Sequence, residues 1–111
     1  MYEYKARLLR VVDGDTVDAE IDLGFDVWVK KRVRLHGIDA PESRTRDLEE
    51  KKLGLESKRR LAELLGACSE EFMIKSHGVG KYGRCLGTII IDGKDINQLL
   101  IKEGYAKEYK K

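Results

Sequence analysis

The chain has 111 residues, of which 41% are hydrophobic and 38% charged, and its formal net charge is only +2. This length suits one compact domain over residues 1–111 and is too short for two. The mixed signs exclude a globally basic nucleic-acid coat, so any attraction to a polyanion must come from a local patch.

The cysteines and the N-terminal residues indicate the cellular compartment in which the protein is expected. Cys68 and Cys85 are too few for a disulfide framework, and both fit a reduced cytosolic setting as small buried hydrophobes. No apolar signal-peptide core is visible at the N-terminus, and no stretch approaches the ~18 apolar residues of a membrane span. We therefore expect a cytoplasmic or phage-encoded intracellular protein without a membrane partner. A leader removed before residue 1 would change that expectation.

The N-terminal third of the chain predicts three strands joined by tight turns. Asp13–Gly14 and Gly24 are turn signals. Alternation is clearest in the second strand, where Val17 to Ile21 present every other residue to a core. Lys30 to Arg32 interrupt the alternation of the third strand, which a bulge or an exposed edge would accommodate. The predicted strands span residues 4–12, 15–22 and 26–36.

The second and third strands would form a hairpin that brings functional residue types together. A turn centred near Gly24–Phe25 pairs positions whose numbers sum to about 49, so Asp15 would lie opposite Arg34. Asp39 and Glu42 follow just beyond the end of the third strand. A register slip of one or two residues would change the pairs.

A long helix is predicted from about Asp47, or alternatively from near Leu55, to Gly66. Gly54 would kink or break it. The apolar residues expected to face the core are Leu48, Leu55, Leu61, Ala62 and Leu65.

The last third predicts two strands, at residues 70–76 and 85–91, separated by a glycine-rich loop over residues 78–83. A short helix over residues 96–103 would be capped by Asp95 or its neighbour. Three meander strands, a helix, two strands and a closing helix are the order of an OB-type barrel. We therefore predict a mainly β (α+β) fold: a five-stranded OB-fold barrel with one long and one short packed helix.

Asp15 and Asp39 are the candidate metal ligands, because hard cations such as Ca²⁺ bind carboxylate and carbonyl oxygens. The carbonyl of Ala40 lies beside Asp39 in the sequence and is a further candidate ligand. Two protein carboxylates would form a water-rich site that a substrate phosphate completes. The alternative is turn chemistry, because Asp-Gly and Asp-Ala-Pro are common turn formers.

Arg34 and Arg84 are the candidate phosphate clamps, because guanidinium groups bind phosphate bidentately and stay charged. Glu42, three residues after Asp39, is the candidate general base for attack on a phosphodiester. Each has a plainer alternative: Arg34 as a cross-strand partner of Asp15, Arg84 as a surface arginine, and Glu42 as a solvated loop residue.

Further residues are candidates for substrate contacts. Lys81 would add a point charge near a terminal phosphate, and Tyr82 a hydroxyl or a stacking face. Tyr109 is a candidate for stacking on a base, as in proteins that bind single strands. His36 and His77 have no partner that suggests catalysis, and we interpret both as structural.

Three segments in this order resemble the staphylococcal (micrococcal) nuclease family. They are Val11–Val17, Val33–Glu42, and Lys81–Arg84 with the following Leu86–Gly87. Asn97 and Gly104–Ala106 resemble the closing helix of the family. The resemblance covers essentially the whole chain.

The resemblance implies an OB-fold phosphodiesterase that depends on Ca²⁺, acts on DNA and RNA, and leaves 3′-phosphate ends. By this resemblance Asp15, Asp39 and the Ala40 carbonyl would hold calcium, Arg34 and Arg84 the phosphate, and Glu42 the attacking water. Lys81 and Tyr82 would contact a neighbouring phosphate.

We expect a preference for single strands and a monomer or weak homodimer. Two alternatives are a catalytically silent OB-fold module that only binds nucleic acid, and a structural domain that binds neither metal nor nucleic acid.

Overall fold

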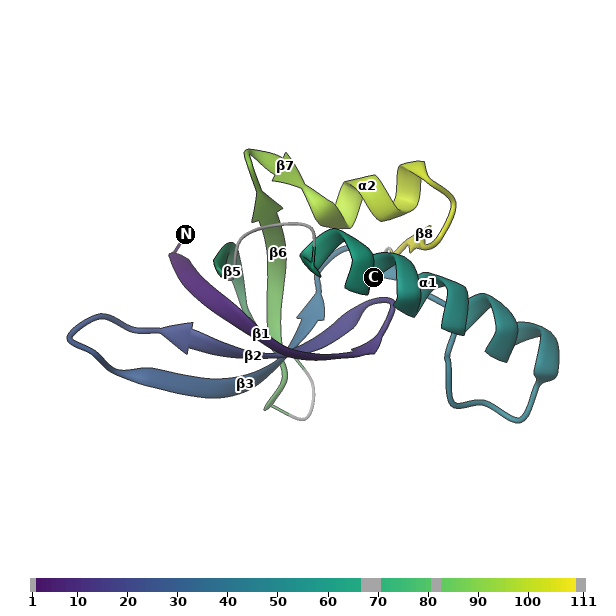
Figure 1. Cartoon of the computed structure of the whole chain (residues 1–111), viewed down its shortest axis with the longest axis horizontal. Helices are drawn as coiled ribbons and strands as arrows, with labels where there is room; N and C mark the ends of the chain where they lie inside the picture. The colour runs from purple at the N-terminus through teal and green to yellow at the C-terminus, as the bar shows by residue number, and fades with distance from the viewer. Residues whose placement is uncertain (1, 67–70, 81–82, 110–111) are drawn as a thin grey trace.

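Five strands close into a barrel, as the alternating segments predict. The computed structural model describes residues 2–66, 71–80 and 83–109 (Figure 1). Antiparallel pairing gives the order β3-β2-β1-β5-β6, and a parallel pairing of β6 with β3 closes the ring. The barrel strands are β1 (Glu3–Asp13), β2 (Thr16–Asp22), β3 (Trp28–Leu35), β5 (Glu71–Val79) and β6 (Cys85–Ile91).

The register of the β2–β3 hairpin differs by one residue from the prediction. Arg34 lies opposite Thr16, so paired positions sum to 50 rather than 49. The turn is centred on Phe25, because Phe25 and Asp26 both adopt left-handed backbone angles (φ 54° and 60°). Leu23 and Val27 close this three-residue loop through a backbone hydrogen bond of 2.8 Å. The predicted pairing of Asp15 with Arg34 is therefore wrong at the level of the backbone.

The basic run Lys30 to Arg32 lies on an exposed edge of the barrel. β3 pairs with β2 along its length without a register shift, but β6 covers only Val33 to Leu35. The first part of β3 therefore has a neighbour on one side only, and its cations face solvent. The predicted strand at residues 70–76 is longer than expected, since β5 continues to Val79.

The interior of the barrel is filled by the apolar residues of the alternating pattern. Val17, Ala19, Val33 and Ile89 are fully buried there. At Gly87 an added Cβ would lie 2.7 Å from Cγ2 of Ile74 and 3.3 Å from Cγ1 of Val33. A glycine at this position therefore allows β6 to approach β3 and β5 closely enough to close the barrel.

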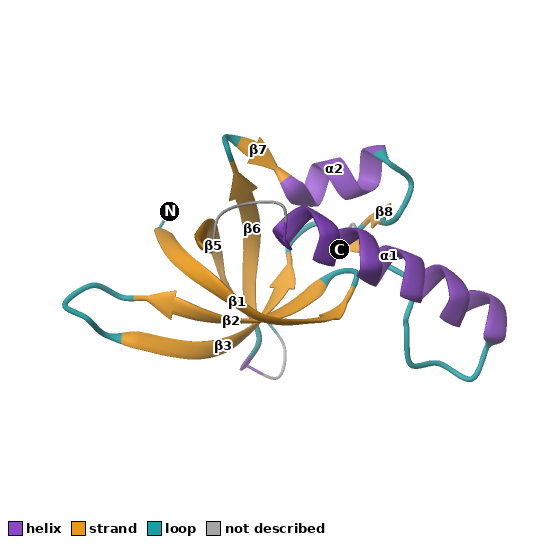
Figure 2. Cartoon of the chain, viewed as in Figure 1, coloured by secondary structure: helices purple, strands orange, loops and turns teal. Residues whose placement is uncertain are grey.

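The long helix α1 (Leu48–Gly66) is continuous through Gly54, so the predicted break there is wrong. Asp47 caps it, because its Oδ1 accepts from the N–H groups of Glu49 and Glu50 at 3.1 and 3.3 Å. The helix lies across the barrel and extends past it (Figures 1 and 2).

The predicted apolar face of α1 is correct only at Leu61 and Leu65. Leu61 and Leu65 are buried, but Leu48, Leu55 and Ala62 are exposed. In the first half, the face toward the protein consists of Gly54 and Ser57. Small residues are required there, because the chain segment before the helix and the β1–β2 turn pack against it.

The short helix α2 (Ile96–Lys102) begins at Asp95, whose side chain accepts from the N–H of Gln98, as predicted. Asn97, 1% exposed, joins this helix to the barrel. Its Oδ1 accepts from the N–H of Ile89 at 3.2 Å, and its Nδ2 donates to the carbonyls of His36 and Gly87 at 2.9 and 3.1 Å. One side chain therefore satisfies three backbone groups at the closing pair of strands.

Three short strands were not predicted. β7 (Lys94–Asp95) extends the β6 edge, while β4 (Ile38–Asp39) pairs with β8 (Lys107–Glu108). Beyond β8, the N–H of Tyr109 donates to the carbonyl of Gly37 at 2.9 Å. The C-terminal segment is thus tied beside Asp39. Neither described helix is long and apolar enough to cross a membrane.

Replacing Asn97 with Ala should lower the free energy of unfolding by about 3 kcal/mol, because it leaves buried backbone groups without partners. Urea denaturation measures this change. The control is Gln98→Ala, an exposed neighbour on the same helix whose loss should cost well under 1 kcal/mol. Equal losses in the two variants would contradict the assigned role of Asn97.

Candidate functional site

Asp15 occupies a buried position just after the β1–β2 turn. Its Oδ2 accepts from the N–H of Ala40 at 2.9 Å, and its Oδ1 from the hydroxyl of Thr16 at 3.0 Å. The turn can sit here because residue 14 is glycine: an added Cβ would lie 2.6 Å from Cβ of Ser57 and 3.0 Å from Cβ of Ala40. A close approach to α1 therefore fixes the position of the carboxylate.

Arg34 lies between two carboxylates that come from different elements. Its Nη1 is 2.9 Å from Oδ2 of Asp15, and its Nη2 is 3.4 Å from Oδ1 of Asp39. The side chain of Asp15 is 11% exposed and that of Asp39 is 58% exposed, so one acid is fixed in the protein and the other faces solvent. Although the backbone register is shifted, the side chains of Asp15 and Arg34 still meet.

The parallel pairing of β3 with β6 brings the second arginine to the same seam. Arg34 pairs with Leu86, two residues after Arg84. Across the described residues, two buried side-chain nitrogens have no hydrogen-bond partner: Nη1 of Arg34 and Nε of Arg84. For Nη1 of Arg34, the 2.9 Å contact with Asp15 has the distance of an ion pair but not the angle of a hydrogen bond. Nε of Arg84 thus lacks a protein acceptor in the described part of the chain, and the paired strands bring two guanidinium groups to one seam, which suits an anionic ligand with several oxygens.

Glu42 is exposed, but its backbone is held on both sides. The next residue, Ser43, donates its N–H and its hydroxyl to Oδ1 of Asp13. On the other side, an added Cβ at Gly54 would lie 2.3 Å from the carbonyl oxygen of Glu42. The segment is therefore clamped between the β1–β2 turn and α1, while the carboxylate of Glu42 remains accessible to water.

The other predicted contact residues have different outcomes. Lys81 and Tyr82 lie outside the described residues. Tyr109 is half exposed, and its ring centroid is 5.9 Å from Cζ of Arg34. The C-terminal segment thus brings an aromatic face to the edge of the arginine–carboxylate cluster.

The histidines and the described cysteine form contacts away from this cluster. The rings of His36 and His77 stack with centroids 4.1 Å apart, and Nε2 of His77 is 2.8 Å from the Thr88 hydroxyl. Burial, and secondly the charge of His36, lower the pKa of His77. Cys85 is a free, partly buried thiol, and Cys68 lies outside the described residues.

The donor set for a cation consists of the two carboxylates that flank Arg34. Among the described residues no three His, Cys, Asp or Glu side chains cluster closely enough to form a metal centre on their own. Both oxygens of Asp15 also accept from protein donors, and Ala40 contacts Asp15 through its N–H. Two hard carboxylate ligands fit a calcium site only if water and a ligand phosphate supply the remaining oxygens.

Sequence reasoning missed the residues that hold the candidate catalytic segment. Asp13 and Ser43 form its buried side, and Gly54 forms its contact with α1. A glycine inside an otherwise helical pattern is a signal of close backbone approach, and Asp13 stands in the same Asp-Gly-Asp motif as Asp15. These signals were present in the sequence, but the long-range partners were not.

The barrel and its cluster define a class of protein: an OB-type fold with an arginine–carboxylate site at the seam where the barrel closes. The chain belongs to the family described as "Staphylococcal nuclease homologue", which matches residues 32–111.

Curated relatives agree with this family. The chain is 32% identical over 103 residues to an uncharacterized protein of Bacillus anthracis, covering 92% of this chain and 46% of the relative. It is 29% identical over 117 residues to a micrococcal nuclease of Shigella flexneri (97% and 60%). It is 34% identical over 100 residues to the SPbeta prophage-derived endonuclease YokF of Bacillus subtilis (88% and 32%). The chain therefore spans less than two thirds of the length of each of these relatives.

Replacing Gly54 with Ala should destabilise the protein by about 2 kcal/mol, although Gly→Ala inside a helix ordinarily stabilises by roughly 0.5–1 kcal/mol. The sign reverses because the new Cβ would collide with backbone atoms of Glu42. Thermal or urea unfolding measures the effect. The matched control is Gly66→Ala in the same helix, where an added Cβ meets nothing within 4 Å. A stabilised Gly54→Ala variant would show that the segment carrying Glu42 is not clamped.

Proposed function

We propose that this chain is a calcium-dependent nuclease that hydrolyses the phosphodiester bonds of DNA and RNA and leaves 3′-phosphate ends. The observation that carries the proposal is the pairing of β3 with β6, which brings Arg84 to the seam where Arg34 lies between the carboxylates of Asp15 and Asp39. Nε of Arg84 is buried there without a hydrogen-bond partner among the described residues. Membership of the nuclease-homologue family and relatives named as nucleases support it.

In this proposal Arg34 and Arg84 bind the phosphate whose bond is broken. Guanidinium groups donate bidentately to phosphate oxygens and stay charged, so they stabilise the additional negative charge of the transition state. Asp15 contacts Nη1 of Arg34 and Asp39 contacts Nη2, which orients the guanidinium group before the substrate arrives. Preformed orientation lowers the reorganisation that catalysis requires.

Glu42 takes the proton of the attacking water. Its exposed carboxylate and its clamped backbone suit a base that must meet solvent while keeping its position. The water oxygen forms a bond to phosphorus as the bond to the 5′ oxygen breaks, which leaves a 3′-phosphate and a 5′-hydroxyl. The leaving oxygen gains a proton from solvent, because an arginine has too high a pKa to release one readily.

Asp15, Asp39 and the Ala40 carbonyl would hold Ca²⁺, which when bound neutralises phosphate charge and makes the phosphorus easier to attack. Ca²⁺ tolerates irregular shells of six to eight oxygens, so a site with two carboxylates completed by water and substrate suits it. Tyr109 would stack on a base beside Arg34, which favours single-stranded substrates. Lys81 and Tyr82 are the proposed contacts to a neighbouring phosphate.

The proposed function is tested by cleavage of denatured DNA with added calcium and with chelator. We expect cleavage that depends on calcium and is lost in Arg34→Ala and in Glu42→Ala. Product ends that accept phosphate from a 5′-kinase would establish the 5′-hydroxyl. Binding without cleavage by the unaltered protein would instead favour a catalytically silent nucleic-acid-binding module.

Glu42→Gln should lower kcat by about 10²-fold or more, as for loss of a general base, while leaving affinity for oligonucleotide nearly unchanged. Single-turnover kinetics and anisotropy of a labelled oligonucleotide separate the two quantities. Exposed Glu3, at the end of β1 far from the β1–β2 turn, offers a control, since Glu3→Gln removes the same charge away from the cluster. If binding and turnover fell together in Glu42→Gln, the residue would be structural rather than the base.

A further inference from the structure

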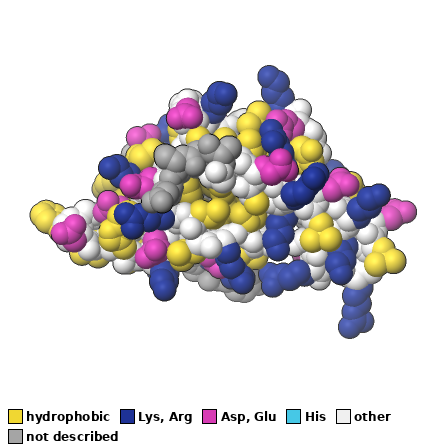
Figure 3. All heavy atoms as spheres, viewed as in Figure 1, with side chains coloured by type: hydrophobic (Ala, Val, Ile, Leu, Met, Phe, Trp, Pro, Cys, Tyr) yellow, Lys and Arg dark blue, Asp and Glu magenta, His cyan; other side chains and the backbone are white. Residues whose placement is uncertain are grey.

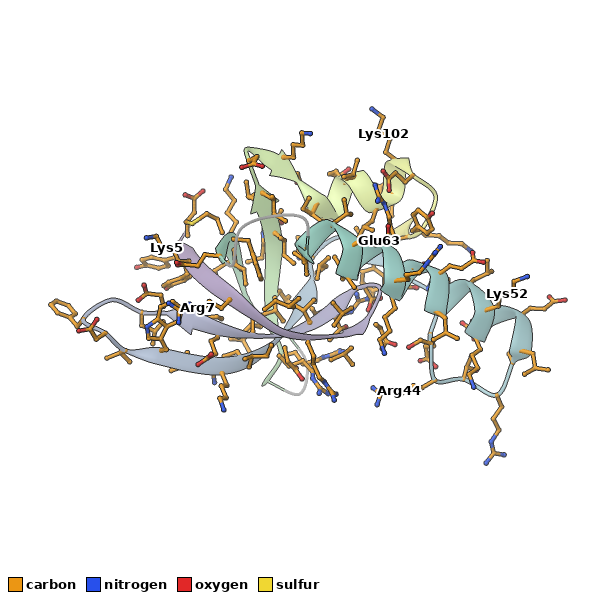
Figure 4. The ribbon with its side chains drawn as sticks, viewed as in Figure 1. Lys5, Arg7, Arg44, Lys52, Glu63 and Lys102 are labelled. Atoms are coloured by element: carbon orange, nitrogen blue, oxygen red, sulfur yellow. The ribbon has the colours of Figure 1, made fainter. Side chains whose placement is uncertain are left out.

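A positively charged pocket lies next to the segment that carries Glu42, apart from the arginine–carboxylate cluster. A surface pocket of about 230 Å³ is lined by Arg10, Val11 and Val12 of β1, by Arg44 in the loop before α1, and by Lys58 of α1. Three cations from three elements thus surround one pocket, and no carboxylate lines it. Figure 3 shows Lys and Arg side chains gathered where the barrel meets α1, and in Figure 4 Arg44 points from its loop toward the barrel.

The charges at this pocket are only partly neutralised by ion pairs. Within the described part of the chain, neither Arg44 nor Lys58 has a carboxylate within ion-pair distance. Arg10 contacts Asp18 at 3.2 Å, but Arg32 contacts the same carboxylate at 2.9 Å. The single negative charge of Asp18 is therefore shared between two guanidinium groups. Arg10, Asp18 and Arg32, on three adjacent strands, together keep an excess of positive charge.

The pocket is small and polar enough for an anionic group rather than an organic molecule. Clefts that bind drug-sized ligands have volumes of roughly 300–1,000 Å³ and are mostly apolar. Here three of the five lining residues are cationic and the other two are valines. A tetrahedral oxyanion such as phosphate matches a pocket lined by three cationic donors.

The pocket lies close in the chain to the arginine–carboxylate cluster at the seam of the barrel. Val12 is followed by Asp13, which holds Ser43, and Arg44 is the next residue. From Ala40, which contacts Asp15, the chain therefore runs through Glu42 and Ser43 to Arg44, which lines the pocket. A polynucleotide bound by Arg34 and Arg84 would carry further phosphates along its backbone, and this pocket offers a place for one of them.

Resting on the proposed function, we propose that Arg10, Arg44 and Lys58 form an accessory site for a backbone phosphate of a single-stranded polynucleotide. The site takes a phosphate at least one nucleotide away from the bond that is broken. It makes the protein favour long strands over dinucleotides, because only a longer strand reaches both places.

The test compares two double variants that remove the same charge. Arg44→Gln with Lys58→Gln alters the pocket, and Lys52→Gln with Lys102→Gln is the control. Lys52 and Lys102 are exposed on α1 and α2 and point away from the pocket (Figure 4). The probe is labelled oligothymidylate of about 16 nucleotides, the upper end of OB-fold site sizes, titrated in chelator over a range of salt concentrations.

We expect the pocket variant to bind oligothymidylate about tenfold more weakly, as for loss of charge-assisted hydrogen bonds. The slope of log affinity against log salt concentration should become less steep by about 0.7, the value for one single-strand phosphate contact. The control variant should keep the slope of the unaltered protein. With calcium, kcat/KM for a thymidine dinucleotide should stay unchanged in both variants.

Equal slopes in the two variants would overturn the accessory site, even if the protein cleaves DNA. An equal loss on dinucleotide and long strand would also overturn it, because the pocket would then act at the reacting bond. If the unaltered protein binds oligothymidylate but cleaves nothing, the proposed nuclease fails while the slopes still decide the accessory site. A protein that binds no oligonucleotide overturns both. Should the double variant not fold, Arg44→Gln against Lys52→Gln gives the same comparison.

Discussion

The parallel pairing of β3 with β6 is the contact on which the rest of the structure depends. Only Val33 to Leu35 take part on one side and Cys85 to Gly87 on the other. This short ladder closes the barrel, and it brings Arg34 and Arg84 to one seam although they are far apart in the sequence. Gly87 permits the close approach, and Asn97 satisfies backbone groups on both sides of it.

A second constraint is the close packing of backbone against the first half of α1. Gly14 approaches Ser57, and Gly54 approaches the carbonyl of Glu42. Larger side chains at these positions would push the turn and the loop away from the helix. The buried carboxylate of Asp15 and the exposed carboxylate of Glu42 are thus positioned by glycines that leave room for close packing. These glycines lower the stability of the fold, because glycine loses more conformational entropy on folding than other residues do.

Most of the fold could be predicted from local patterns in the sequence. The features that depend on long-range contacts could not. Alternation predicted the N-terminal strands, apolar runs between glycine-rich turns predicted β5 and β6, and Asp95 with its following apolar residues predicted α2. The face of α1 was mispredicted, because the helix extends past the barrel and leaves Leu48 and Leu55 in solvent. Periodicity identifies an apolar stripe but not where its partner ends.

The hairpin error has a similar origin. The turn centre differs from the prediction because Phe25 and Asp26 adopt left-handed backbone angles. Neither residue is a glycine, so the sequence contained no signal for these angles. The candidate cluster was nevertheless anticipated, because Asp15 and Arg34 lie at one end of the hairpin in either register. The clamp formed by Asp13 and Ser43, and the pocket at Arg44 and Lys58, join segments that no local rule connects.

The part of α1 beyond the barrel has a consequence for the dynamics of the molecule. Leu48, Leu53 and Leu55 are exposed there, so this half of the helix gains little from burial. Segments with few buried apolar contacts open locally at lower free energy than the core does. Amide hydrogens of the first turns should exchange with solvent through fraying, while those of β6 exchange only on global unfolding. Because the Glu42 segment packs on Gly54, an opening that reaches Gly54 removes one side of its clamp, while the bonds of Ser43 to Asp13 and the two arginines of the barrel stay in place.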